Sequence, residues 1–276
     1  MILDAHQHFW KYQAWDYPWI DDSMQVLKRD FLPPDLEQEL RKLNIDGTIA
    51  VQARQNLEET RWLLKLSDKF DFIKGVVGWV DLCSHELESQ LEEVAGNHKL
   101  VGVRHVVHDE SDDRFMARSD FQNGLAMLAE YNLTYDLLIF PKHLALATEL
   151  VSLFPDQVFI LDHIAKPGIK DGIRSPWDKE IHLLAEHPNV YCKLSGMVTE
   201  ANWQEWQPDD FRYYLDVVFE AFGADKLMIG SDWPVCMLAG AYNKVMALVL
   251  NYLAQYDNKI QQKILGMNCA SAYRII

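Results

Sequence analysis

Residues 2–10 of the chain read ILDAHQHFW. The first part is a short apolar run of the kind that forms a buried parallel strand. The turn after it contains two histidines and two aromatic residues, whereas an open doubly wound sheet needs a glycine-rich turn after its first strand. The stretch therefore favours a closed barrel over an open sheet.

Seven further runs of this type follow along the chain. Their starts extend from residue 2 to residue 227 in seven steps of about 32 residues, which is the length of one strand and one crossover helix. The eight runs are ILDAH from Ile2, TIAVQA from Thr48, FIKGVVGWVDL from Phe72, LVGVRHVV from Leu100, LTYDLLIF from Leu133, VFILDH from Val158, VYCKLSG from Val190 and LMIGSDW from Leu227. This spacing predicts a single-domain (β/α)8 TIM barrel over residues 1–276.

Helix signals lie between the predicted strands. Asn56 and Glu59 have the spacing of a capping box, and Ser84 marks a second helix start. Ser175 and Pro176 provide a cap and a proline at a third start. We therefore expect each strand to be followed by a helix, as an α/β barrel requires.

The segment from Phe9 to Pro34 is an insertion after the first predicted strand, and it contains Trp10, Trp15 and Trp19. A loop at this place lies over the carboxyl end of a barrel. Two interpretations are open. The segment is a lid over a site, or its aromatic side chains pack it onto the body of the barrel.

Composition restricts the class of protein. The chain has 276 residues, 49% of them hydrophobic, and a formal net charge of −15. A negative field of this size repels phosphate backbones and anionic lipids, so neither nucleic acid nor a membrane is expected as a partner. The four cysteines form no CxxC pair, which predicts neither a zinc knuckle nor a disulfide framework and favours the cytoplasm. We expect a monomer or a homodimer.

Histidine and aspartate side chains occur at the ends of three predicted strands. In a strand, residues i and i+2 point to the same face, so His6 and His8 should both point into the mouth of the barrel. His163 ends the sixth run and Asp232 ends the eighth, where barrel enzymes keep catalytic groups. Packed histidines are the alternative for the His-x-His motif taken alone.

Five motifs together point to a known family. They are DAHQHFW, GVRH, LDHIAKP, KLSGMVTEANW and IGSDWPV. In this order and over nearly the whole chain, they resemble the amidohydrolase superfamily. The resemblance is greatest to the branch of TIM-barrel metal-dependent hydrolases that contains L-fuconolactonases, L-rhamnonolactonases and relatives acting on muconolactone-type and pyrone lactones. It implies a lactonase of carbohydrate metabolism, such as fucose catabolism, with a sugar lactone as substrate.

The resemblance also implies roles for single residues. It makes His6 and His8 the histidine pair of the first strand and His163 the histidine of the sixth strand. Asp232 becomes the carboxylate that activates water. We expect Asp232 to take a proton from water and to return it to the ring oxygen, while His163, Arg104 or a metal ion stabilises the oxyanion.

The predicted metal content follows from a departure from the family pattern. Binuclear members have a carboxylated lysine on strand four and a histidine on strand five. This chain has Arg104 with His105 in the first region and Asp136 in the second. We therefore expect at most one divalent ion, zinc by preference, held by the first-strand histidines with His163 or Asp232. The resemblance also allows a reaction without any metal.

Further polar and aromatic residues at the predicted strand ends are candidates for substrate binding. They are Gln52, Arg104, Lys166, Lys193 and Trp233. Structural salt bridges are the alternative for Arg104 and Lys166. We expect His105 and His108 to pack or to support other groups rather than to bind a metal.

Three other functions remain open at this point. One is decarboxylation of a small unsaturated or aromatic acid by the same kind of barrel. Another is an aldolase that uses Lys193 or Lys166 as a Schiff-base amine, since a lysine near a strand end can be desolvated into a nucleophile. The last is binding of a sugar acid without catalysis.

Overall fold

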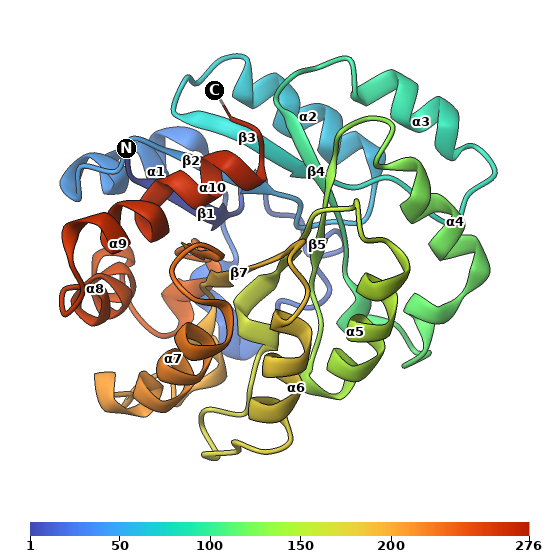
Figure 1. Ribbon diagram of the computed structural model, residues 1–276. Coiled ribbons are helices and arrows are strands. Elements are labelled where there is room, and N and C mark those ends of the chain that lie inside the picture. Colours follow the sequence, from blue (N-terminus) through green and yellow to red (C-terminus); the bar gives the residue numbers. More distant parts are fainter. Residues whose placement is uncertain (276) are drawn as a thin grey trace.

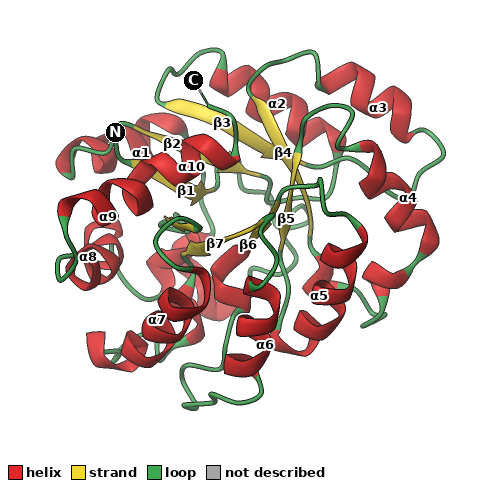
Figure 2. Ribbon diagram, in the orientation of Figure 1, coloured by secondary structure: helices red, strands yellow, loops and turns green. Residues whose placement is uncertain are grey.

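Eight parallel strands form one sheet in the order β1 to β8, and helices surround it (Figure 1, Figure 2). The computed structural model describes residues 1–275. Strands β1 and β8, at the two edges of the sheet, contact each other, so the sheet curls into a nearly closed barrel. The predicted single-domain (β/α)8 TIM barrel is confirmed.

Each of the eight predicted runs overlaps one strand. The strands are β1 (Leu3–Gln7), β2 (Gly47–Val51), β3 (Ile73–Gly78), β4 (Leu100–His105), β5 (Thr134–Leu137), β6 (Phe159–Leu161), β7 (Val190–Leu194) and β8 (Leu227–Ile229). Nearly all of their residues are buried, because helices cover one face of the sheet and side chains fill the other. This burial on both faces explains why the runs are apolar without alternation.

The helices occupy the connections between strands. Their bounds are α1 (Pro33–Lys42), α2 (Leu57–Ser67), α3 (Leu87–Val94), α4 (Ser119–Met127), α5 (Leu144–Leu153), α6 (Trp177–Ala185), α7 (Pro208–Phe222), α8 (Tyr242–Leu253), α9 (Asn258–Gln262) and α10 (Asn268–Ala272). Asn56 caps α2 as predicted, accepting a hydrogen bond of 2.8 Å from the Glu59 N–H. The prediction that Ser84 begins a helix is wrong, because its hydroxyl accepts from the Glu86 N–H in a turn before α3.

The barrel closes between β1 and β8. A parallel bridge joins Gln7 to Trp233, where the His8 N–H donates to the Trp233 carbonyl oxygen at 2.6 Å. The Asp232 N–H donates to the His6 carbonyl oxygen at 2.8 Å. These hydrogen bonds place the two histidines of β1 beside the carboxylate that follows β8.

Strand β1 is irregular, since its register with β2 shifts between Asp4 and Gln7. Simple alternation would put Asp4 and His6 on the same face. Instead, the Asp4 carboxylate accepts hydrogen bonds from the Ser231 hydroxyl at 2.6 Å and from the Tyr242 hydroxyl of α8 at 3.1 Å. The shift thus lets β1 anchor outward to α8 and still direct His6 inward, as bulges in strands do.

The end of the chain covers the amino-terminal end of the barrel. Cys269 of α10 and Tyr273 after it pack against Leu3 and Ile49, which lie near the beginnings of β1 and β2, and Figure 1 shows α10 close to β1. The Tyr273 hydroxyl donates to Asp136 Oδ2 at 2.7 Å inside the barrel. The carboxyl end is therefore the open end.

The insertion from Phe9 to Pro34 both packs and lines a cavity. Trp10 and Phe31 are fully buried, and their backbones exchange two hydrogen bonds of 3.0 and 2.9 Å. Trp15 and Trp19 are 78% and 37% exposed and lie in the wall of the main cavity. The packing interpretation thus applies to Trp10 and Phe31, and the position expected of a lid over the site applies to Trp15 and Trp19.

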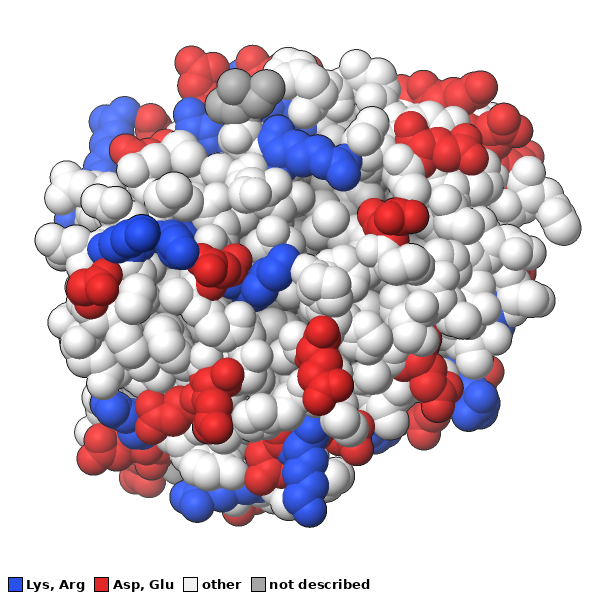
Figure 3. Space-filling view, in the orientation of Figure 1, with Lys and Arg blue, Asp and Glu red and all other residues white. Residues whose placement is uncertain are grey.

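The outer surface carries charges of both signs. Figure 3 shows acidic and basic side chains interspersed over the face in view. Within residues 1–275, no helix has the length and apolar character needed to cross a bilayer. All four cysteines are free, and Cys192 and Cys236 are buried, as expected for small apolar residues.

Candidate active site

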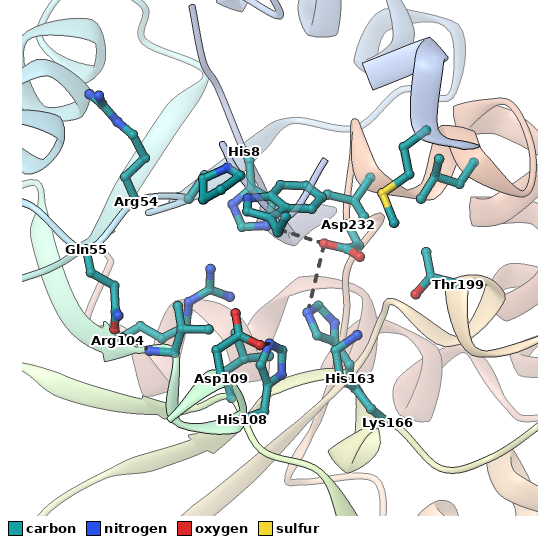
Figure 4. Close-up of a pocket in the computed structure, with 18 of the residues that line it drawn as sticks. His8, Arg54, Gln55, Arg104, His108, Asp109, His163, Lys166, Thr199 and Asp232 are labelled. Atoms are coloured by element: carbon teal, nitrogen blue, oxygen red, sulfur yellow. Dashed lines mark hydrogen bonds and ion pairs between the residues drawn. The ribbon is translucent and has the colours of Figure 1, made fainter. Parts of the chain in front are cut away.

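A cavity of about 730 Å³ opens at the carboxyl end of the barrel. Its wall is built from residues at or after the ends of every strand except β3, together with the β1 insertion. Figure 4 shows His8, His163 and Asp232 pointing toward one another at this cavity, with Arg54, Gln55 and Arg104 on another side of it. This is the end at which barrel enzymes carry their active sites.

Three imidazoles surround one carboxylate. Asp232 Oδ1 lies 3.3 Å from His8 Nε2, 3.7 Å from His6 Nε2 and 3.9 Å from His163 Nε2. The Nε2 atoms of His6 and His8 are 3.2 Å apart. All four side chains are buried, so the four groups that the sequence singled out meet at one point.

The other ring nitrogens orient two of these imidazoles. His8 Nδ1 lies 2.8 Å from the Val51 carbonyl oxygen. Because a carbonyl only accepts, this nitrogen carries the proton and Nε2 presents its lone pair. His163 Nδ1 lies 2.9 Å from the Ser195 hydroxyl oxygen.

The backbone is strained where two of these residues lie. Asp232 has a φ of 57°, and His163, Ile164, Ala165 and Lys166 have φ values of 54°, 48°, 60° and 50°. Four successive residues other than glycine in the left-handed region are rare, and each costs roughly 1–2 kcal/mol. Such strain persists only where surrounding contacts impose it, and it concentrates at functional sites.

Two contacts hold this left-handed turn. The Trp177 indole N–H donates to the Ile164 carbonyl oxygen at 2.8 Å. Gly196, itself at a φ of 61°, lies against the His163 ring, where an added Cβ would be only 2.4 Å from Nδ1. The ring position of His163 therefore depends on a glycine after β7 and on an indole at the start of α6.

A buried network of charges lies beneath the imidazoles. Arg104 Nη1 contacts Asp162 Oδ2 at 2.9 Å. Lys193 Nζ contacts Asp136 Oδ2 at 2.5 Å and Asp162 Oδ1 at 2.9 Å. Asp162 Oδ1 is also 3.2 Å from His6 Nδ1. Two cations and two carboxylates thus balance in the interior and fix the ring of His6.

Burial and these charges set the protonation states. Burial alone would raise the pKa of Asp232, but the imidazoles of His163 and His8 beside it outweigh burial and lower the pKa below the ordinary value. Burial lowers the pKa of His163 well below its ordinary value. Burial alone would lower the pKa of Lys193, yet its two carboxylate partners raise it. At neutral pH the site holds an ionised Asp232, a neutral His163 and a protonated Lys193.

The comparison with known proteins agrees with this geometry. The amidohydrolase family model matches residues 3–275, which is almost the whole chain. The chain belongs to the amidohydrolase family.

Two relatives of this amidohydrolase have a named activity. An L-fucono-1,5-lactonase from Burkholderia multivorans is 41% identical over 257 residues, which are 90% of this chain and 86% of the relative. An L-fucono-1,5-lactonase from Burkholderia ambifaria is 34% identical over 99% of this chain and 95% of the relative. A crystal structure of an amidohydrolase from Burkholderia multivorans with bound zinc covers both chains completely, with a TM-score of 0.96 and 38% identity.

Only some of the residues predicted to bind substrate line the cavity of this amidohydrolase. Arg104 and Lys166 line it. Gln52 is behind Arg104, accepting from its Nη2 at 2.8 Å, and Lys193 is fully buried in the charge network. Trp233 lines a separate cavity of about 230 Å³. Gln52, Lys193 and Trp233 therefore do not line the main cavity, and their direct contact with substrate stays an untested prediction.

The two other histidines after β4 differ from each other. His105 stacks on Phe115 and contacts Glu110 at 2.6 Å, so it packs as predicted. His108 stacks on Phe140 but also lines the cavity. Burial, with Lys166 and Arg104 nearby, lowers the pKa of His108 to about 3, so this imidazole is neutral.

Sequence reasoning missed several residues of the site. Asp162, at the carboxyl end of an apolar run directly before His163, carried a usable signal, because a carboxylate there must enter the barrel. Ser195, Gly196 and Glu200 lie in the KLSGMVTEANW motif, but the motif does not show their contacts, which join loops that follow different strands.

The donor set fits one small divalent ion. His6 Nε2, His8 Nε2 and Asp232 Oδ1 all lie within 4.8 Å of one another, and imidazole nitrogens with a carboxylate oxygen are typical zinc ligands. The tautomer of His8 leaves Nε2 free to ligate. Arg104 Nη1 lies 3.2 Å from the same His6 Nε2, and Lys193 Nζ lies 3.2 Å from Nδ1, on the other side of the ring. These two cations disfavour a second metal ion there.

Proposed function

We propose that this amidohydrolase is a lactonase that opens L-fucono-1,5-lactone or a closely related sugar lactone to the aldonic acid. The observation that carries the proposal is the ionised carboxylate of Asp232, buried among three imidazoles at a cavity large enough for a sugar ring. The two named lactonases at 41% and 34% identity support the choice of substrate.

Asp232 acts as the general base in this proposal. Its carboxylate takes a proton from water, and the water oxygen bonds to the lactone carbonyl carbon. When the tetrahedral intermediate collapses, the bond from that carbon to the ring oxygen breaks. Asp232 then returns the proton to the ring oxygen, so the carboxylate is regenerated. The strained backbone of Asp232 holds its carboxylate in the cavity wall for both transfers.

His163 and Arg104 are the residues that we assign to the oxyanion. Both line the cavity, and His163 Nε2 lies 3.9 Å from the base, which leaves space for a reacting atom near both groups. The Arg104 guanidinium is fixed by Asp162 and Gln52. A fixed donor of this kind needs no reorganisation when charge develops, and removing one costs about 3–4 kcal/mol of barrier.

We further propose that His6 and His8, with Asp232 or His163, hold one divalent ion, zinc by preference. A divalent ion there supplies Lewis-acid polarisation of a carbonyl oxygen. The relative with bound zinc supports this assignment. Metal analysis of freshly purified protein is expected to give about one zinc per chain, and His8→Ala is expected to lose it. Activity that survives complete chelation would restrict the role of the ion to structure.

The test of the function is acid release from L-fucono-1,5-lactone, followed with a pH indicator. The purified protein is expected to exceed the spontaneous rate, and Asp232→Asn is expected to lower kcat by about 10²–10⁴. Asn keeps the size of the side chain, and circular dichroism controls for folding. No acid release from any member of a sugar-lactone panel would refute the proposal.

The aldolase alternative meets a physical obstacle. A Schiff-base amine must be neutral and accessible, whereas Lys193 is buried with two carboxylates and Lys166 lies 2.6 Å from Glu200 Oε1. The two carboxylates keep Lys193 an ammonium ion, and Lys166 is engaged by the Glu200 carboxylate. Absence of a covalent adduct after borohydride treatment with a carbonyl substrate is the expected result.

The cellular location and the oligomeric state of the enzyme stay predictions. Four free cysteines fit a reducing cytoplasm. We also keep the proposal of a monomer or homodimer, which size-exclusion chromatography with light scattering would test.

A further inference from the structure

The cavity wall carries three cations, and each has an acidic partner. Among residues 1–275, the lysines and arginines that line it are Arg54, Arg104 and Lys166. Arg54 Nη1 lies 2.9 Å from Asp16 Oδ2, and Arg104 has a partner in the buried network described above. Lys166 Nζ lies 2.6 Å from Glu200 Oε1.

The wall as a whole is not positive. Asp16, Asp109, Glu200 and Asp232 are acidic residues of the same lining, and His108 is neutral. A charge-balanced wall suits a neutral polyhydroxylated ring, because it offers donors and acceptors without a free cation. A substrate with a carboxylate away from the reacting carbonyl would meet acidic groups and no unpaired cation, and like charges in such a site are costly.

The pair of Lys166 and Glu200 is partly open to solvent, with side chains that are 16% and 21% exposed. Arg54 and Asp16 are open to a similar degree, at 22% and 29%, whereas Arg104 and Asp162 are 4% and 0% exposed. The pair joins the loops after β6 and β7, and the Lys170 N–H to Glu200 carbonyl hydrogen bond of 2.9 Å joins the same loops through the backbone. Loss of the Glu200 charge therefore leaves the loops connected and Lys166 uncompensated.

We propose that Glu200 is a specificity-determining residue, which neutralises Lys166 in the cavity wall and so excludes lactones that carry a second carboxylate. This inference rests on the proposed lactonase function and assigns its substrate class as neutral lactones. Glu200 acts through Lys166 and takes no part in bond making.

The experiment compares two matched substrates. One is L-fucono-1,5-lactone, and the other is the galactarolactone of the same ring configuration, in which a carboxylate replaces the terminal methyl group. The wild type is expected to prefer the neutral lactone by at least about a hundredfold in kcat/KM. Hydrolysis of neither substrate would refute the lactonase function itself, while comparable rates on both would overturn only the present inference.

Glu200→Gln is the decisive variant, because Gln keeps the side-chain size and an acceptor oxygen. The preference for the neutral lactone is expected to fall by about tenfold or more, and the gain on the galactarolactone should shrink with added salt. The matched control is Glu205→Gln, which removes the same charge from an exposed residue nearby that does not line the cavity. A folded Glu200→Gln protein with the wild-type preference would overturn the inference.

A measurement on the wild type avoids any risk that the variant fails to fold. Galactarate and L-fuconate differ by the terminal carboxylate, and both are compared as inhibitors of L-fucono-1,5-lactone hydrolysis. We expect the inhibition constant of galactarate to be at least about tenfold higher. Equal constants would show that the wall tolerates the extra charge and would overturn the inference.

Discussion

The His163 ring rests on Gly196, and Gly196→Ala tests whether this contact controls catalysis. The new Cβ would lie 2.4 Å from Nδ1, 2.6 Å from Cγ and 3.0 Å from Cβ of His163. Ordinary contact begins at 3.4 Å, so the imidazole must move by about 1 Å. A displacement of this size at a reacting group can lower the rate about a hundredfold.

The same substitution has a second effect, which is on stability. Gly196 has a φ of 61°, and an alanine in the left-handed region costs roughly 1–2 kcal/mol. Gly172 has a φ of 64° and no atom within 4 Å of an added Cβ. Gly172→Ala therefore has the same backbone cost without the contact, which makes it the matched control.

Urea unfolding and the kcat/KM for L-fucono-1,5-lactone are measured on both variants. We expect both to lose roughly 1–2 kcal/mol of stability, while only Gly196→Ala loses about a hundredfold in kcat/KM. Wild-type activity in a folded Gly196→Ala protein would refute the argument that the glycine positions His163. Equal activity losses in both variants would assign the effect to backbone strain instead.

Three further predictions concern groups around the barrel. Tyr273→Phe removes a donor from the buried Asp136 carboxylate and is expected to cost about 1.5–3 kcal/mol in urea unfolding; an unchanged midpoint would contradict it. Trp177→Phe removes the hydrogen bond to Ile164 and should lower stability by about 1 kcal/mol together with kcat, and an unaltered kcat would refute its positioning role. Burial raises the pKa of Glu59 from 4.5 to about 7, so the folded state keeps a proton that the unfolded chain loses. The contribution of Glu59 to the free energy of unfolding is then highest below pH 4.5 and falls by about 3 kcal/mol up to pH 7, and Glu59→Gln should remove this contribution.

Much of the fold could be predicted because burial leaves a local signature. The eight apolar runs matched eight strands, since a strand covered on both faces needs apolar residues throughout. Where a prediction was wrong, local chemistry decided: the Ser84 hydroxyl caps a turn instead of starting α3. The direction of the Asp4 side chain could not be predicted from the sequence either. It depends on a register shift in β1, which is set by the fit of this strand to its neighbours in the sheet.

The candidate site was predictable only in its innermost residues. His6, His8, His163 and Asp232 stand at strand ends, and strand ends of a barrel converge whatever the details of the loops. Lys193 showed the limit of this reasoning. Its place in β7 directs it inward, but its depth and its two carboxylate partners keep it away from the cavity.

The sequence by itself determined the number and order of the strands, the open end at which four polar groups gather and the acidic character of the whole protein. Only the tertiary structure decided the left-handed turn at His163, the contact of its ring with Gly196 and the pairing of Lys166 with Glu200. The physical reason is how far apart in the sequence the interacting residues lie. Burial and strand direction are properties of a few neighbouring residues, whereas strain and charge pairing depend on which distant loops the closed barrel brings together.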